Sequence, residues 1–187
     1  MRAIPIVPAF HTNDTTFYCG PAALACLTGL TGKEARHTVN RLRKAQYPWV
    51  ELDDEVGGMS DAEMLFALEA VGLGGSYQVY GSHYRFGGVT SRKMNLRQWS
   101  KTIDRPGLYL VSLTQHFVVV EDVHEPGAVW TRAFDPDAPA GMPVDKHPAR
   151  RQYVQRVWRI QRDVQIPQEF IGETVNEKEN DSRWRPQ

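Results

Sequence analysis

The stretch GLYLVSLTQHFVVVEDVHEPGAVWTRAF, residues 107–134, decides the fold. Residues 108–113 and 117–120 are runs of β-branched, aromatic and other apolar side chains with the length of strands. A Pro-Gly turn then leads into residues 128–134, which alternate as a returning strand. We predict that these strands form an antiparallel sheet. One more strand is predicted over residues 153–164, after a loop rich in Pro and Asp.

The chain before this stretch has the pattern of helices. Residues 19–30 are rich in Ala and Leu, with a Pro in the first turn, where its missing N–H is harmless. Two more helices are predicted after Thr31 and Ser60, because each of these residues begins a capping box. In a capping box, the side chain of a Thr or Ser and the side chain of a Glu three residues later each accept a hydrogen bond from the other residue's backbone N–H. A shorter helix is predicted over residues 95–103. Helices followed by strands favour an α+β class, with N-terminal helices packed on a C-terminal antiparallel β-sheet.

The composition restricts the class of protein. The chain has 187 residues, with 22 Lys and Arg against 22 Asp and Glu, and only two cysteines. Its length predicts a single domain over residues 1–170, and the polar tail at residues 171–187 is expected to be mobile or bound to an assembly partner. Zero net charge argues against a nucleic acid partner, which needs an excess of Lys and Arg. Two cysteines exclude a disulfide framework and a thiolate zinc site.

The chain also lacks the patterns of membrane proteins. Its longest apolar run is far short of the roughly 20 residues that a membrane span requires, and the first ten residues lack the apolar segment of a secretory signal. No histidine has a partner at the spacing of metal ligands. We therefore expect a cytoplasmic protein with no membrane partner and no metal or cofactor.

The segment Tyr18-Cys19-Gly20-Pro21 places a cysteine where the first helix begins. A helix N-terminus carries a partial positive charge that favours thiolate over thiol, and its free backbone N–H groups can face a developing oxyanion. Cys26, seven residues on, is interpreted as a small core residue. Cys19 is therefore the candidate nucleophile, although burial in the core is the commoner fate of a free cysteine.

A thiolate nucleophile needs a base, and His116 is the candidate. It directly precedes the apolar strand at residues 117–120 and so lies at a strand mouth. Asp135 ends the next strand, and a hairpin would bring the two residues to the same end of the sheet, where the carboxylate could orient the imidazole. Asp122 and Asp137 are rival carboxylates, and Asp135 before a proline also fits a plain turn residue.

A cysteine at the start of an early helix, followed by a histidine and an aspartate on late strands, resembles the motif order of the papain-like cysteine peptidases. The motifs look most like those of the bacteriocin-processing, double-glycine-cleaving branch and its stand-alone relatives in bacteria and phages. The resemblance spans about residues 10–140 and rests on four segments, at residues 13–24, 107–109, 116–120 and 135–136. It implies a papain-like fold in which Cys19 is the nucleophile, His116 the general base and Asp135 the residue that orients the base.

The chain departs from this branch at one position. The branch usually has a glutamine six positions before the cysteine as an oxyanion donor, and this sequence has Asn13 there. Asparagine keeps an N–H₂ donor on a shorter arm, so the resemblance implies an oxyanion role for Asn13. A turn or helix N-terminal residue without a catalytic task is the other interpretation.

Two functions of different classes follow. The first is a cysteine-dependent hydrolase, a peptidase or isopeptidase acting on a peptide or protein substrate. The alternative is a papain-like module with weak or no activity, acting as a structural or binding component of a larger assembly such as a phage particle. Asn13 and the polar tail favour this alternative. Acyl transfer by the same three residues is a third possibility.

Other features are given ordinary structural interpretations. The glycine pairs at 57–58, 74–75 and 87–88 are interpreted as loop residues. His124 and His147 are interpreted as turn residues.

Overall fold

The computed structural model describes residues 18–49, 58–79, 93–136, 138 and 141–162. The elements follow in the order α1 (Cys19–Thr28), α2 (Gly32–Gln46), α3 (Asp61–Ala70), β1 (Leu73–Val79), α4 (Leu96–Ser100), β2 (Gly107–Leu113), β3 (His116–Glu125), β4 (Ala128–Phe134), β5 (Met142–Pro143), the 3-10 helix η2 (Pro148–Arg151) and β6 (Val154–Arg162). Helices and an antiparallel sheet are thus combined in one fold, and the predicted α+β class is confirmed.

The strands form one six-stranded sheet with the order β1-β6-β2-β3-β4-β5. All its pairings are antiparallel, and the hairpins β2–β3 and β3–β4 are those that the sequence predicts. The interpretation of the glycine pair at 74–75 as a loop was wrong, because both glycines lie within β1 and pair with Gln161 and Ile160 of β6. Strand β1 therefore adds an edge to the sheet from the helical half of the chain.

The helices begin where their capping residues predict. Thr31 caps α2 and Ser60 caps α3, each in a complete capping box with the Glu three residues later. Helix α1 ends at Thr28 and is capped by Gly29, whose left-handed φ of 78° suits glycine. Helix α4 is shorter than predicted and follows Asn95, which caps it. Within the described residues, no helix has the length and apolar character to span a membrane.

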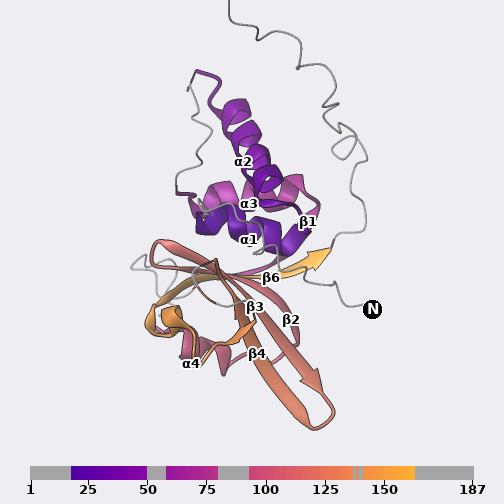
Figure 1. The fold of residues 1–187 in the computed structure, drawn as a ribbon. Coiled ribbons are helices and arrows are strands. Elements are labelled where there is room, and N and C mark those ends of the chain that lie inside the picture. The colour runs from indigo at the N-terminus through magenta and orange to yellow at the C-terminus, as the bar shows by residue number, and fades with distance from the viewer. Residues whose placement is uncertain (1–17, 50–57, 80–92, 137, 139–140, 163–187) are drawn as a thin grey trace, which may run out of the picture.

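The central strands β2 and β3 are largely buried on both faces, and Figure 1 shows α1, α2 and α3 on one side of the sheet and α4 on the other. Alternate residues of β2 divide between two cores: Leu108 and Leu110 pack with the helical layer, whereas Tyr109 and Val111 pack with α4 and η2. A strand buried on both faces has an unbroken apolar sequence. This explains the apolar runs at residues 108–113 and 117–120.

Candidate active site

The structure brings His116 and Asp135 together at one end of the sheet. Strand β3 begins at His116, its antiparallel neighbour β4 ends at Phe134, and Asp135 is the next residue. The His116 Nε2 atom lies 2.5 Å from the Asp135 Oδ2 atom. The Asp135 side chain is only 2% exposed, and the His116 side chain is 14% exposed. The carboxylate is therefore held inside the protein while the imidazole reaches its surface.

The His116 side chain also interacts with Cys19. Burial of the ring is the largest single influence on the pKa of His116, and it lowers this pKa. Hydrogen bonds and charge attraction from Asp135 and Cys19 together outweigh burial. The net effect raises the pKa of His116 from 6.5 to about 10. The imidazole is therefore expected to be protonated at neutral pH. Three residues from α1, β3 and the end of β4 thus form one interacting group: Cys19, His116 and Asp135.

The two cysteines occupy different surroundings. Cys19 is the first residue of α1 and is half-buried, and α1 packs against β3. Cys26 is 2% exposed within the core of the helical layer. Burial, with a smaller contribution from the charge of Glu121, raises the pKa of Cys26 to about 12. Cys26 is a core residue, as predicted.

The rival carboxylates do not share this position among the described residues. Asp122 is buried at the middle of the β3–β4 ladder, where it lies 2.7 Å from His124 and accepts a hydrogen bond of 2.8 Å from Thr131. Asp137 lies outside the described residues, as does Asn13, so the oxyanion role of Asn13 stays a prediction.

A second histidine beside Asp135 was missed by the sequence analysis. His147 is 0% exposed, and its Nε2 atom lies 3.6 Å from the Asp135 Oδ2 atom. The interpretation of His147 as a turn residue was incomplete: it caps η2, but it is also packed against Asp135. The only sequence signal was its position before a proline, which predicts a helix start and says nothing of a partner 12 residues earlier.

An open pocket of about 330 Å³ lies beside the group. Among the described residues, those that line it are Thr114, Gln115, His116, Asp135, Pro148, Ala149 and Gln152. Three of them, Thr114, Gln115 and Gln152, offer neutral hydrogen-bonding side chains. Gln115 has a φ of 60° in the two-residue turn before His116, a conformation that non-glycine residues rarely adopt. The ring of His116 is therefore accessible from a polar pocket.

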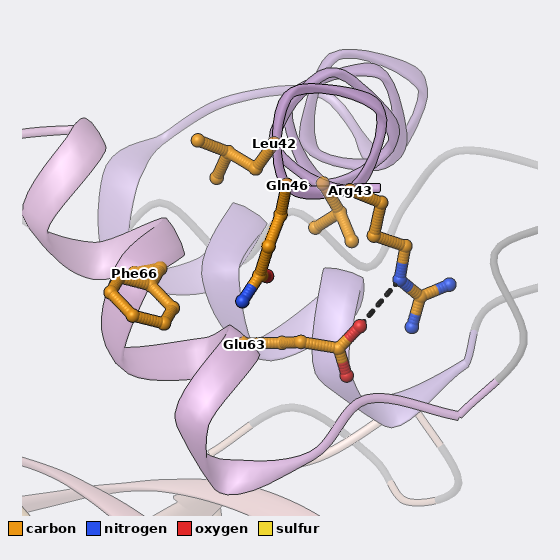
Figure 2. Close-up of a pocket in the computed structure, with 6 residues that line it drawn as sticks. Leu42, Arg43, Gln46, Glu63 and Phe66 are labelled. Carbon is orange, nitrogen blue, oxygen red and sulfur yellow. Dashed lines mark hydrogen bonds and ion pairs between the residues drawn. The ribbon is translucent and has the colours of Figure 1, made fainter. Parts of the chain in front are cut away.

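A second cavity lies between α2 and α3. Figure 2 shows Leu42 and Gln46 of α2 facing Phe66 of α3, with Arg43 bonded to Glu63 across the gap. Burial raises the pKa of Glu63, but hydrogen bonds from Arg43 and Ser60 outweigh it and lower the pKa below its ordinary value. The cavity volume is about 10 Å³, room for one water molecule. This cavity is thus too small for a substrate.

The described part of the chain contains no group of three or more His, Cys, Asp or Glu side chains that could hold a metal ion. No family model matches the chain, and no curated protein or solved structure matches it either.

Proposed function

We propose that this chain is a papain-like, cysteine-dependent hydrolase that cleaves a peptide or isopeptide bond. The observation that carries the proposal is the pair of interactions made by His116, with Cys19 on one side and Asp135 on the other. A nucleophile, a base and a residue that orients the base are the parts that nucleophilic catalysis requires. Their contact also favours an enzyme over a structural module whose site is idle.

The proposed reaction begins with a thiolate and an imidazolium. Because Nε2 of His116 contacts Asp135, we assign proton exchange with the sulfur and the leaving group to Nδ1. The Cys19 thiolate attacks the carbonyl carbon, an S–C bond forms, and the carbonyl π electrons move to the oxygen. As the C–N bond breaks, the imidazolium donates its proton to the departing nitrogen, which leaves a thioester on Cys19.

Water then completes the hydrolysis. Neutral His116 takes a proton from the attacking water as the water oxygen forms a bond to the thioester carbon. The C–S bond then breaks, the carboxylic acid product leaves, and the imidazolium and the thiolate are restored. Asp135 remains ionised throughout and stabilises the imidazolium by its charge.

The N-terminus of α1 supplies the expected oxyanion donors. The first N–H groups of a helix have no carbonyl partner within the helix, and Cys19 is the first residue of α1. The Cys19 N–H is therefore available to the carbonyl oxygen when it becomes negatively charged. The Asn13 side chain is proposed as the second donor.

The first test is selective alkylation. Native protein, Cys19→Ala and Cys26→Ala are treated briefly with iodoacetamide near pH 6, and the labelled peptides are identified by mass spectrometry. An ordinary thiol is almost entirely protonated at this pH, so rapid labelling requires a stabilised thiolate. We expect rapid labelling in the native protein and in Cys26→Ala, and none in Cys19→Ala. Equal labelling of both cysteines, or of neither, would contradict the nucleophile assignment.

The second test measures catalysis. A mixture of denatured proteins and ubiquitin-like conjugates is incubated with the native protein or with Cys19→Ala, and new N-termini and released amines are counted by mass spectrometry. Products that depend on Cys19 support a hydrolase. The incubation is done in water alone and with an added amine. If Cys19 is labelled rapidly but no product forms under either condition, the result would instead support the structural module. Products joined to the added amine would indicate acyl transfer.

A further inference from the structure

We propose that His147 is a positioning residue for the catalytic group: its ring holds the Asp135 carboxylate in the orientation and charge state that His116 requires. This inference rests on the proposed hydrolase function and adds to it a fourth residue that the motifs do not contain. The juxtaposition that carries it is the approach of two histidines, His116 and His147, to a single oxygen atom of Asp135.

The hydrogen bonds of His147 define where its proton lies. The Nδ1 atom of His147 accepts a hydrogen bond of 3.2 Å from the backbone N–H of Ala149, so Nδ1 carries no proton. A neutral imidazole whose Nδ1 accepts a hydrogen bond has its proton on Nε2. The Nε2 atom is the one that faces Asp135 Oδ2, at 3.6 Å. The ring nitrogen that carries the proton of His147 is therefore the one nearest to the carboxylate.

The distance indicates the kind of interaction. A separation of 3.6 Å exceeds the usual hydrogen-bond range of about 2.7–3.2 Å, so the contact acts as an N–H dipole beside a charge. Such a dipole has most effect where water is excluded. Both side chains satisfy this condition, since that of His147 is 1% exposed and that of Asp135 is 2% exposed.

A neutral donor suits this place better than a cation. Each N–H that faces a buried carboxylate makes its ionised form easier to keep, and only an ionised Asp135 stabilises the His116 imidazolium. A Lys or Arg at position 147 would keep the carboxylate ionised but would compete with His116 for it. The N–H of a neutral imidazole stabilises the charge and leaves the short 2.5 Å contact to His116.

His147 also has a plainly structural role, and the two roles can be separated. Its Nδ1 atom caps η2, so a role in folding alone would be satisfied by any good capping residue. Asparagine is such a residue, but its short side chain cannot reach Asp135 while it caps. Glutamine is longer: its amide oxygen can accept from Ala149 while its N–H₂ group points to Asp135. His147→Asn thus removes the positioning contact, and His147→Gln restores it.

The test is the pH dependence of Cys19 alkylation by iodoacetamide, followed at the Cys19 peptide between about pH 4 and pH 9. A weaker hold on Asp135 makes the imidazolium less stable, so the thiolate forms only at higher pH. For His147→Asn we expect the acidic limb of the profile to move up by about one pH unit, a roughly tenfold lower rate on that limb. For His147→Gln we expect a profile close to that of the native protein.

A folded His147→Asn variant with the native profile would overturn the proposal, and so would equal shifts in the Asn and Gln variants. Failure of the proposed function is a separate result: the acidic limb of the native protein would then coincide with that of the urea-unfolded chain. If neither variant folds, the ¹⁵N shifts of the His147 ring in the native protein decide. A ring protonated on Nε2 and not on Nδ1 is expected, and protonation on Nδ1 would overturn the proposal.

Discussion

At the scale of single residues, the environment of Cys19 depends on the glycine that follows it. A methyl group added at Gly20 would lie 2.6 Å from the sulfur of Met59 and 3.0 Å from its Cβ atom. The sulfur could move aside, but the Cβ atom is fixed to the backbone. We expect Gly20→Ala to lower the free energy of unfolding by about 1–3 kcal/mol, as overpacking does, when it is measured by urea denaturation.

The control for this prediction is the same substitution in a Met59→Ala background. There the added methyl group has room, and alanine is the better helix former by roughly 0.5–1 kcal/mol, so Gly20→Ala should stabilise the protein. A destabilisation of equal size in both backgrounds would show that the Met59 side chain is not the cause.

The raised pKa of His116 predicts a dependence of stability on pH. A group whose pKa is higher in the folded state stabilises the fold fully below its unfolded pKa, and this contribution is lost as the pH rises through the folded pKa. For His116 the window runs from 6.5 to about 10. We expect the free energy of unfolding to decline over this window in the native protein and to decline less in His116→Gln.

The thiol of Cys19 has its own proton, so the comparison is repeated in a Cys19→Ala background. In Cys19→Ala, Cys19 no longer contributes to the pKa of His116, so the decline in the free energy of unfolding should end below pH 10. This decline should still be larger than the decline measured for the Cys19→Ala/His116→Gln variant. Parallel curves for these two variants, measured by urea denaturation at each pH, would refute the ion pair of His116 with Asp135.

Sequence patterns predicted the positions of some residues of the candidate site but not of all of them. The positions of Cys19, His116 and Asp135 were predictable because each lies at the start or end of an element that the sequence marks clearly. The contact of His147 with Asp135 was not predictable, because an irregular loop joins the two residues. No local sequence pattern indicates the path of such a loop through space.

At the scale of elements, local signals predicted what they physically control. The capping boxes at Thr31 and Ser60 fix where two helices begin, because they satisfy backbone N–H groups that nothing else in the helix can satisfy. Strand β1 was missed because Gly-Gly is a loop signal, whereas the pairing of β1 with β6 is a long-range contact. The short helix α4 ends at Ser100, earlier than the predicted end at residue 103.

One interaction ties the helical layer to the sheet. Asp61, the first residue of α3, accepts a hydrogen bond of 2.7 Å from the buried Ser112 hydroxyl of β2 and forms an ion pair with Arg156 of β6. Asp61→Ala would leave the Ser112 hydroxyl without this acceptor, which costs about 1–3 kcal/mol. We therefore expect Ser112→Ala to be less damaging in the Asp61→Ala background than in the native protein.

A matched substitution separates the hydrogen bond from the ion pair. Asp61→Asn keeps an oxygen for Ser112 and removes the charge that faces Arg156. Because the Arg156 side chain is 41% exposed and can be hydrated, this change should cost about 1 kcal/mol or less in urea denaturation. Equal losses from Asp61→Asn and Asp61→Ala would assign the stabilisation to the ion pair instead of the Ser112 hydrogen bond.

At the scale of the whole molecule, the candidate site exists only where two layers meet. Cys19 belongs to α1 in the helical layer, whereas His116 and Asp135 belong to the sheet. Residues of α1 and β3 pack together in one core. Val144 and Ala149, which lie on either side of His147 in the sequence, pack in the other core and so anchor the segment that carries His147. Neither layer alone would bring thiol and imidazole together, so the reactivity of Cys19 should report the integrity of the fold.

The two cysteines should therefore respond to unfolding in opposite directions. In native protein near pH 6 we expect iodoacetamide to label Cys19 rapidly, as the proposed thiolate–imidazolium pair requires. We expect Cys26 to stay unlabelled, because it is 2% exposed and burial raises its pKa to about 12. Unfolding removes both effects, so in rising urea the rate at Cys19 should fall and the rate at Cys26 should rise until the two agree. Both changes should share the midpoint of the far-UV circular dichroism transition. Rapid labelling of Cys19 that persists above that midpoint would mean that its reactivity comes from the local sequence and does not need the sheet.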